Sequence, residues 1–232
     1  MRNGKIIYHG STQVIEKPIL GIGNPKNDYG LGFYCTQDVE LAKEWACTEQ
    51  DSGFSNQYVL DEKDLSVLNL NGGEYHILNW IATLLENRLF RLREDVAIRS
   101  KEYILDNFSI DYKNYDVVCG YRADDSYFSY ANAFLNNTLS LEKLEKAMLY
   151  GKLGEQIVLR TGKAFEQLAF MKAETVDREI YYPKKLARDM EAREAFRKDR
   201  LVGDVEEETY VLDIVRGRWK EDDTRLQRRI FG

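Results

Sequence analysis

The chain has few cysteines, and their spacing does not fit a disulfide or zinc-binding framework. Cys35, Cys47 and Cys119 are odd in number, widely separated, and contain no Cys-x-x-Cys pair. Disulfide-rich and zinc-binding proteins use paired or closely spaced cysteines, so we expect reduced thiols in a cytoplasmic protein. A simpler interpretation, in which the three are small half-buried side chains, fits the same spacing.

Long apolar runs are missing as well. No stretch approaches the roughly 20 apolar residues that a membrane-spanning helix needs. Residues 1–4 lead into a predicted strand without the apolar region of a signal peptide, and we expect no membrane partner. The formal net charge of −6 gives no overall basic footprint for general nucleic-acid binding, although the basic stretch 225–229 is a local candidate.

Several common catalytic signatures are absent. The sequence contains no P-loop, zinc ligand set or Ser-His-Asp arrangement. The stretch Gly21-Ile22-Gly23-Asn24 lacks the third glycine and the following helix of a dinucleotide-binding fingerprint. His76 has no acidic or cysteine partner at metal-ligand spacing, so we expect a structural histidine there and no bound metal.

The composition indicates a folded chain of mixed secondary structure. With 232 residues, 44% of them hydrophobic, the chain can form one domain, or one domain with an appendage, around a sizeable core. Periodicity predicts a helix from Thr36, its expected N-cap, to residue 46. Further helices are expected at 77–89, 102–108, 140–148 and 184–200, and strands at 5–8, 57–60, 65–70, 115–121, 155–160 and 164–170. This pattern alone indicates only a mixed α and β protein.

Two short stretches near the start of the chain combine histidine, tyrosine and glycine at the ends of apolar runs. They are Tyr8-His9-Gly10-Ser11-Thr12 and Gly32-Phe33-Tyr34-Cys35-Thr36, and the second follows a glycine-rich loop at 27–32. A histidine and a tyrosine placed at the ends of apolar runs next to glycines can together bind a flat polar ring. Trp45 follows Tyr34 on the predicted helix, and Glu155 opens a late predicted strand.

In their order and context, these segments resemble the His-Tyr-Glu branch of the ADP-ribosyltransferase superfamily, the branch of diphtheria toxin and the poly-ADP-ribose polymerases. They are also similar to an uncharacterised bacterial family that carries the same three segments. The resemblance implies an α+β fold, a split β-sandwich of two small antiparallel sheets around an NAD cleft. The catalytic domain would occupy residues 1–172, with an inserted helical block at 74–108. Residues 173–232 would form a charged helical extension packed on the core.

The resemblance also implies roles for the first segment. His9 would hydrogen-bond a hydroxyl of the adenosine-side ribose, and the Gly10 backbone would hold the nicotinamide carboxamide. Ser11 and Thr12 would contact ribose. Taken alone, a histidine at a strand end is more often structural than functional.

The remaining roles implied by the resemblance concern the nicotinamide end of NAD, where the bond is broken. Tyr34 would stack on one face of the nicotinamide, and Trp45 would stand near the other face, where the toxin-like pattern has a second tyrosine. Glu155 would bind the 2′-hydroxyl of the nicotinamide-side ribose and stabilise the developing cation. The alternative for Tyr34 and Trp45 is an ordinary place in the core. Leu153 occupies the position where arginine-modifying transferases carry a glutamate, so an arginine acceptor is not expected.

A further polar stretch follows the predicted strand at 115–121. Arg122, Asp124 and Asp125 could position an acceptor, bind the phosphates of the donor through the arginine, or pair with each other. Alternatively, one of the two acids caps the next helix.

The resemblance implies a mono-ADP-ribosyltransferase that uses NAD as its substrate, needs no metal, and modifies an unknown macromolecular acceptor. The same site could hydrolyse NAD, and an inactive module that binds a nucleotide or protein is the alternative from another class. A toxin, a defence effector and a housekeeping modifier all fit these residues. Because a free cytoplasmic transferase of this kind can harm its own cell, a neutralising partner protein is also expected.

Overall fold

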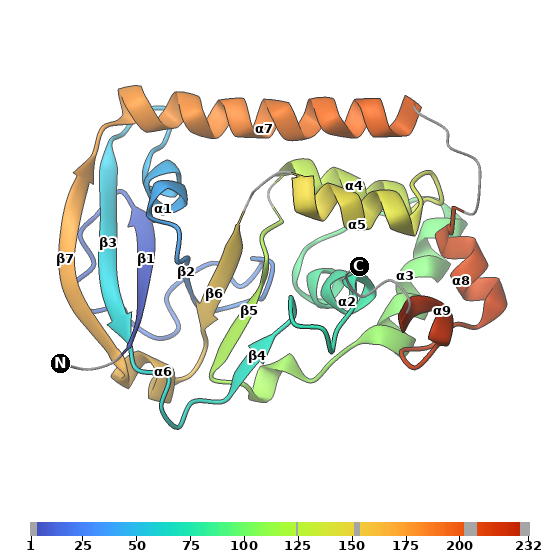
Figure 1. Ribbon diagram of the computed structural model, residues 1–232, viewed down its shortest axis with the longest axis horizontal. Helices are drawn as coiled ribbons and strands as arrows, with labels where there is room; N and C mark the ends of the chain where they lie inside the picture. Colours follow the sequence, from blue (N-terminus) through green and yellow to red (C-terminus); the bar gives the residue numbers. More distant parts are fainter. Residues whose placement is uncertain (1–3, 124, 151–153, 202–207, 228–232) are drawn as a thin grey trace. The chain divides into compact units, whose positions relative to one another are not determined.

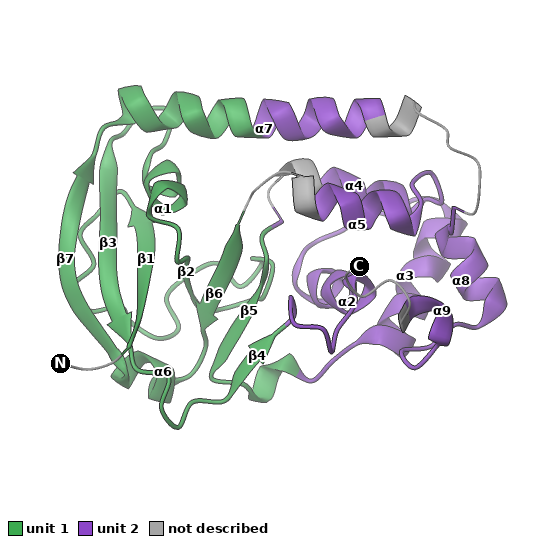
Figure 2. Cartoon of the chain, in the orientation of Figure 1, with its two compact units in different colours: residues 1–69, 112–122, 153–188 green, residues 70–111, 123–152, 189–232 purple. Residues whose placement is uncertain are grey.

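A computed structural model describes residues 4–123, 125–150, 154–201 and 208–227 (Figure 1). The chain forms two compact units that alternate along the sequence (Figure 2). Unit 1 comprises residues 1–69, 112–122 and 153–188, and unit 2 comprises residues 70–111, 123–152 and 189–232. Neither unit is therefore built from one continuous segment.

Unit 1 contains two small sheets. The first is antiparallel, in the order β1-β3-β7, and the second has the order β2-β6-β5-β4. The predicted α+β class is confirmed, but the expectation of two antiparallel sheets is wrong for one pair, because β4 runs parallel to β5. A parallel pair needs a long crossover, and residues 70–111 supply one. The strands are β1 (Lys5–Ser11), β2 (Phe33–Cys35), β3 (Gly53–Leu60), β4 (Val67–Asn69), β5 (Val117–Tyr121), β6 (Glu155–Leu159) and β7 (Leu168–Val176).

The two sheets of unit 1 share one apolar core. Ile7, Tyr58 and Leu60 come from the first sheet, whereas Cys35, Val117, Cys119, Ile157 and Leu159 come from the second. All three cysteines are buried free thiols, and burial raises the pKa of Cys119 to about 11, so this thiol stays protonated and unreactive near neutral pH.

The helix that follows β2 begins two residues later than predicted. In α1 (Val39–Ala46) the N-cap is Asp38, whose carboxylate accepts hydrogen bonds from the backbone N–H groups of Glu40 and Leu41. Thr36 cannot serve as the cap because its N–H and C=O are both bonded to Tyr8, at 2.9 and 2.7 Å. This bridge joins β1 to the end of β2.

The predicted strand at 164–170 is also corrected. The short helix α6 (Gly162–Glu166) occupies its first half, and β7 begins at Leu168. The Thr161 hydroxyl accepts from the N–H of Ala164, so a helix cap directs the chain here in place of an extended strand.

The regular secondary structure of unit 2 is helical over its described residues. Its helices are α2 (Ile77–Asn87), α3 (Asp95–Phe108), α4 (Asp125–Leu135), α5 (Leu141–Tyr150), α8 (Val211–Gly217) and α9 (Thr224–Gln227), while the 3-10 turn at Tyr112–Asn114 belongs to unit 1. The structural role predicted for His76 is confirmed: its ring accepts from the N–H of Leu78 and caps α2. No helix in the described ranges has both the length and the apolar character required to cross a bilayer.

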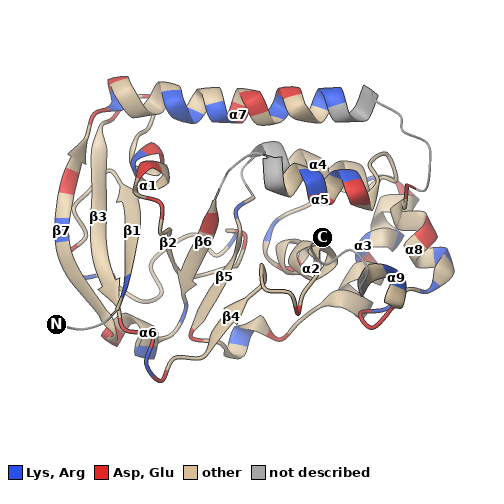
Figure 3. Ribbon diagram, in the orientation of Figure 1, with Lys and Arg blue, Asp and Glu red and all other residues tan. Residues whose placement is uncertain are grey.

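The long helix α7 (Arg178–Leu201) confirms the helix predicted at 184–200 and carries charged side chains along its described length (Figure 3). Its residues up to 188 belong to unit 1 and the later ones to unit 2. Within unit 1, Arg188 forms two hydrogen bonds to the buried carboxylate of Glu44, at 2.7 and 2.8 Å. Lys184 lies 3.4 Å from the Glu40 carboxylate, so α7 is tied to α1 by two ion pairs one helical turn apart.

Candidate functional site

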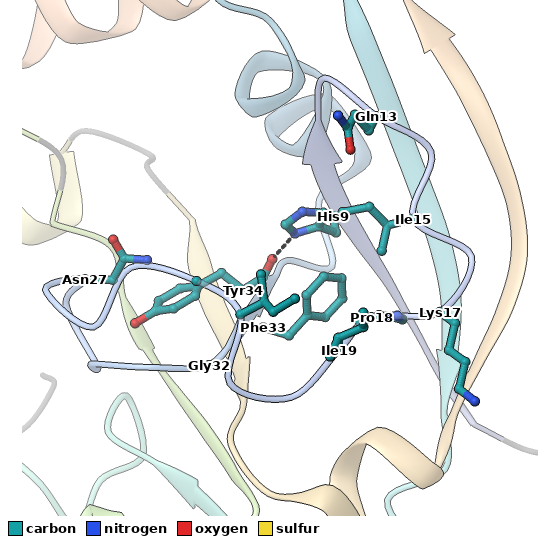
Figure 4. A pocket seen from close by; sticks show the side chains of 12 residues that line it. His9, Gln13, Ile15, Lys17, Pro18, Ile19, Asn27, Gly32, Phe33 and Tyr34 are labelled. Carbon is teal, nitrogen blue, oxygen red and sulfur yellow. Dashed lines mark hydrogen bonds between the residues drawn. The ribbon is translucent and has the colours of Figure 1, made fainter.

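A pocket of about 440 Å³ lies beside β1 and β2, under the loop that joins them (Figure 4). Its lining is mostly apolar with a few amide and ring groups, a composition typical of small-molecule sites. The lining residues are His9, Gln13, Ile15, Lys17, Pro18, Ile19, Ile22, Gly23, Asn27, Gly32, Phe33 and Tyr34.

His9 and Tyr34, the first two predicted site residues, meet at this pocket. The Nδ1 atom of His9 lies 2.7 Å from the carbonyl oxygen of Tyr34 (Figure 4). Because a carbonyl oxygen only accepts, Nδ1 carries the hydrogen and donates it. Burial lowers the pKa of His9 below its ordinary value, so the ring is neutral near pH 7 and Nε2 is left as an acceptor. Phe33 stacks on the ring at a centroid distance of 4.4 Å.

The first part of the loop is fastened to β3 by a fully buried amide. The side-chain oxygen of Asn56 accepts from the N–H of Ile15 at 2.9 Å, and its NH₂ group lies 3.2 Å from the carbonyl oxygens of His9 and Gln13. The hydroxyl of Tyr58 donates to the carbonyl of Ile15. One wall of the pocket is therefore held by two side chains of a single strand.

The last part of the loop is fastened to the second sheet. The Tyr34 hydroxyl donates to the carbonyl of Gly30 at 2.6 Å and accepts from the N–H of Tyr29 at 3.1 Å. Burial raises the pKa of the Tyr34 hydroxyl well above its ordinary value, so it stays protonated. Arg160 donates to the carbonyl of Tyr29, and Gln156 donates to Asp28 at 3.4 Å.

Strand register separates Tyr34 from Glu155. Tyr34 lies opposite Val158, and Glu155 is three positions further along β6, which is about 10 Å of strand. Side chains alternate between the two faces of a sheet, so Tyr34 shares the face of Val158, whereas Glu155 shares the face of Ile157. Glu155 is exposed at the start of its strand and does not line the pocket of His9 and Tyr34.

Gly10 packs against α1. Its backbone N–H and C=O groups face the space beside the Tyr8–Thr36 bridge, which joins β1 to the end of β2. A Cβ atom at this position would lie 1.9 Å from the carbonyl oxygen of Ala42, so a side chain does not fit. Backbone groups two residues apart point to the same strand edge, and those of Tyr8 point to Thr36. The N–H and C=O of Gly10 therefore point the same way, and we find no hydrogen bond from them to other described residues.

The remaining predicted site residues are spread over unit 1 and beyond. Trp45 is half-buried on α1, and the guanidinium of Arg122 lies 4.9 Å from the centroid of its ring. The Ser11 hydroxyl donates to the carbonyl of Gln13, and Thr12 is exposed. Asp124 lies outside the described residues, and Asp125 begins α4 in unit 2 with a side chain that is not described.

Three residues that shape this region were missed from the sequence. Asn56 holds the loop, Phe33 stacks on His9, and Tyr29 is fully buried with its hydroxyl on the carbonyl of Tyr121. The signal for Asn56 was present, because a polar residue lies among the inward positions of a strand whose alternation is otherwise apolar.

Residues 5–170 match the sequence model of a family described as "Protein of unknown function (DUF3990)". The chain belongs to this family. The DUF3990 match runs from the start of β1 into β7 and includes His9, Tyr34 and Glu155 as well as the helices at 77–108. No curated protein and no solved structure matched the chain. The DUF3990 description assigns no activity, so a functional conclusion depends on the geometry of the site.

Proposed function

We propose that this protein is a mono-ADP-ribosyltransferase, which cleaves NAD between nicotinamide and ribose and transfers ADP-ribose to an acceptor. The observation that carries the proposal is the neutral His9, locked through Nδ1 by the Tyr34 carbonyl with Nε2 left as an acceptor, beside the open backbone edge of Gly10. Two sheets with one shared core agree with the split β-sandwich expected for such enzymes.

The backbone N–H and C=O groups of Gly10 are complementary to a primary carboxamide. Nicotinamide carries one NH₂ donor and one C=O acceptor, and the Gly10 carbonyl and N–H offer one complementary group for each. The close approach of α1 to Gly10 excludes a side chain that would cover these groups. In this arrangement the Nε2 atom of His9 accepts from a ribose hydroxyl, and Tyr34 acts by orienting His9 through its carbonyl.

In this proposal the Glu155 carboxylate supplies the negative charge that stabilises the transition state. When the bond between C1′ and the nicotinamide nitrogen breaks, both electrons leave with nicotinamide, and C1′ becomes an oxocarbenium ion. A carboxylate near the ribose stabilises this charge, and such an interaction accelerates the reaction only insofar as it strengthens in the transition state. The acceptor then bonds to C1′ with a lone pair and loses its proton to Glu155 or to water. Trp45 flanks the nicotinamide in this proposal.

The deciding experiment compares nicotinamide release from NAD by the wild-type protein, Glu155→Gln and Glu166→Gln. Glu155→Gln keeps the size of the side chain and removes its charge, so the rate should fall by about 10²–10³-fold while NAD affinity changes little. Glu166 is an exposed glutamate on α6 and serves as the control. Equal rates for the wild-type protein and Glu155→Gln would refute the proposal.

One observation favours hydrolysis at the same site as a second candidate. Glu155 is exposed, so water can reach the developing cation without a macromolecular acceptor. A labelled-NAD assay separates the two activities, because hydrolysis yields free ADP-ribose and transfer yields a labelled acceptor.

A further inference from the structure

Tyr121 ends β5 directly opposite Glu155 in the antiparallel β5–β6 pair. Opposite residues in such a pair project from the same face, with Cβ atoms about 4.5–5.5 Å apart. Tyr121 is half-buried and Glu155 is exposed. Because a tyrosine side chain is longer than that of glutamate, the Tyr121 ring is within reach of a ligand that contacts the Glu155 carboxylate.

The backbone that carries this ring is fixed from the other face of the sheet. The hydroxyl of Tyr29 donates to the carbonyl of Tyr121 at 2.6 Å. A Cβ atom at Gly120 would lie 2.2 Å from the Tyr29 hydroxyl oxygen, so glycine leaves the space that Tyr29 occupies. Since Tyr29 is fully buried, the end of β5 is positioned before a ligand binds, which is the condition for a preorganised site.

The other aromatic candidates are placed differently. Tyr34 projects from the opposite face of β2–β6, with its hydroxyl bonded to the loop. Trp45 lies on α1, outside the β5–β6 pair, with the Arg122 guanidinium near its ring. Tyr121 is thus the aromatic residue that strand pairing sets beside Glu155.

The nicotinamide ring of NAD is a cationic pyridinium, and its positive charge passes to the ribose as the glycosidic bond breaks. Aromatic faces attract cations. We infer that Tyr121 is a substrate-contact residue whose ring binds the cationic nicotinamide end of NAD beside Glu155. This role rests on the proposed function, and it adds a residue that the sequence motifs did not indicate.

The test measures the dissociation constants of NADH and NAD by titration calorimetry. The quantity compared between variants is the Kd for NADH divided by the Kd for NAD. NADH has the same adenosine and phosphates but a neutral dihydronicotinamide ring. Replacing Tyr121 by leucine should therefore weaken NAD binding and leave NADH binding nearly unchanged, lowering the ratio by roughly 5-fold. Tyr121→Phe keeps the aromatic face and should stay within about 2-fold of the wild-type ratio.

Tyr115→Leu is the matched control. Tyr115 is also half-buried and precedes the opposite end of β5, so the same substitution there should leave the ratio unchanged. Melting temperatures of all variants show whether each still folds, and the Tyr121→Phe ratio distinguishes loss of the ring from loss of the hydroxyl.

The outcomes separate this role from the proposed function. If nicotinamide release depends on Glu155 but Tyr121→Leu keeps the wild-type ratio, the proposed function stands and the role of Tyr121 is overturned. If NAD binds with the expected ratios but no nicotinamide is released, the contact is supported and the transferase proposal fails. A wild-type protein that binds neither nucleotide overturns both.

Discussion

Replacing Asn56 with alanine tests whether the pocket wall depends on one buried amide. Asn56 is fully buried and accepts one hydrogen bond, from Ile15, while its NH₂ group lies within reach of several carbonyl oxygens, including those of His9 and Gln13. An NH₂ group donates twice, so the substitution removes about three hydrogen bonds, each with a net value of about 1 kcal/mol. We expect the free energy of unfolding to fall by about 3 kcal/mol.

The assay is urea denaturation followed by circular dichroism, together with a thermal melt. A loss of about 3 kcal/mol corresponds to a decrease in Tm of roughly 6–12 °C for a chain of this size. Gln50→Ala, an exposed position between α1 and β3, should change stability by no more than about 0.5 kcal/mol. Under the proposed function, release of the segment from Gln13 to Ile15 should raise KM for NAD more than it lowers kcat.

One result would refute this reasoning. If Asn56→Ala unfolds within about 0.5 kcal/mol of the wild-type protein, the amide does not hold the loop, and the shape of the pocket must depend on Tyr58 and the apolar lining alone. Unchanged stability with a raised KM would instead indicate that Asn56 shapes the segment from Gln13 to Ile15 without contributing to the overall stability.

Two further predictions concern stability. Burial lowers the pKa of His76 to about 4, below the ordinary value of about 6.5, so the unfolded chain takes up a proton first as the pH falls. The free energy of unfolding should therefore decrease between pH 6.5 and 4, by at most about 3 kcal/mol, and His76→Asn, which keeps a capping side chain, should show a flatter pH profile in denaturation experiments. Arg188→Met leaves the buried Glu44 carboxylate without its bidentate partner and should cost about 3 kcal/mol. The double variant with Glu44→Gln should recover much of that loss in a thermal melt, and an equal loss in both variants would show that the unpaired Glu44 charge is not its cause.

The sequence predicted the elements better than their ends and their partners. The apolar side formed by Leu141, Leu144 and Met148 located the helix at 140–148. High charge density located the long helix at 184–200. The start of α1 was misplaced because the Tyr8–Thr36 bridge, a contact between distant segments, decides which residue is free to cap. The parallel pairing of β4 with β5 was missed for the same reason, since pairing direction depends on where the crossover returns.

For the candidate site, too, the sequence predicted individual residues better than their spatial arrangement. His9 and Tyr34 were recognisable from their motifs, but their contact through the Tyr34 carbonyl depends on the Tyr8–Thr36 bridge that joins β1 to the end of β2. The faces from which Tyr34 and Glu155 project depend on the register of β2 against β6, and no local pattern encodes that register. Tyr121 was hidden for the same reason, because its pairing with Glu155 joins residues from separate segments.

The alternation of the two units along the chain has a consequence for synthesis. The partner of β2 in its sheet is β6, so a nascent chain that ends before Glu155 leaves β2 without that neighbour. Long-range strand pairing of this kind is slow, because distant segments must meet before contacts form. Under the proposed function, a product that ends before Glu155 would contain His9 and Tyr34 but lack the catalytic carboxylate. Activity would then begin only after synthesis has passed Glu155, which limits damage from incomplete copies.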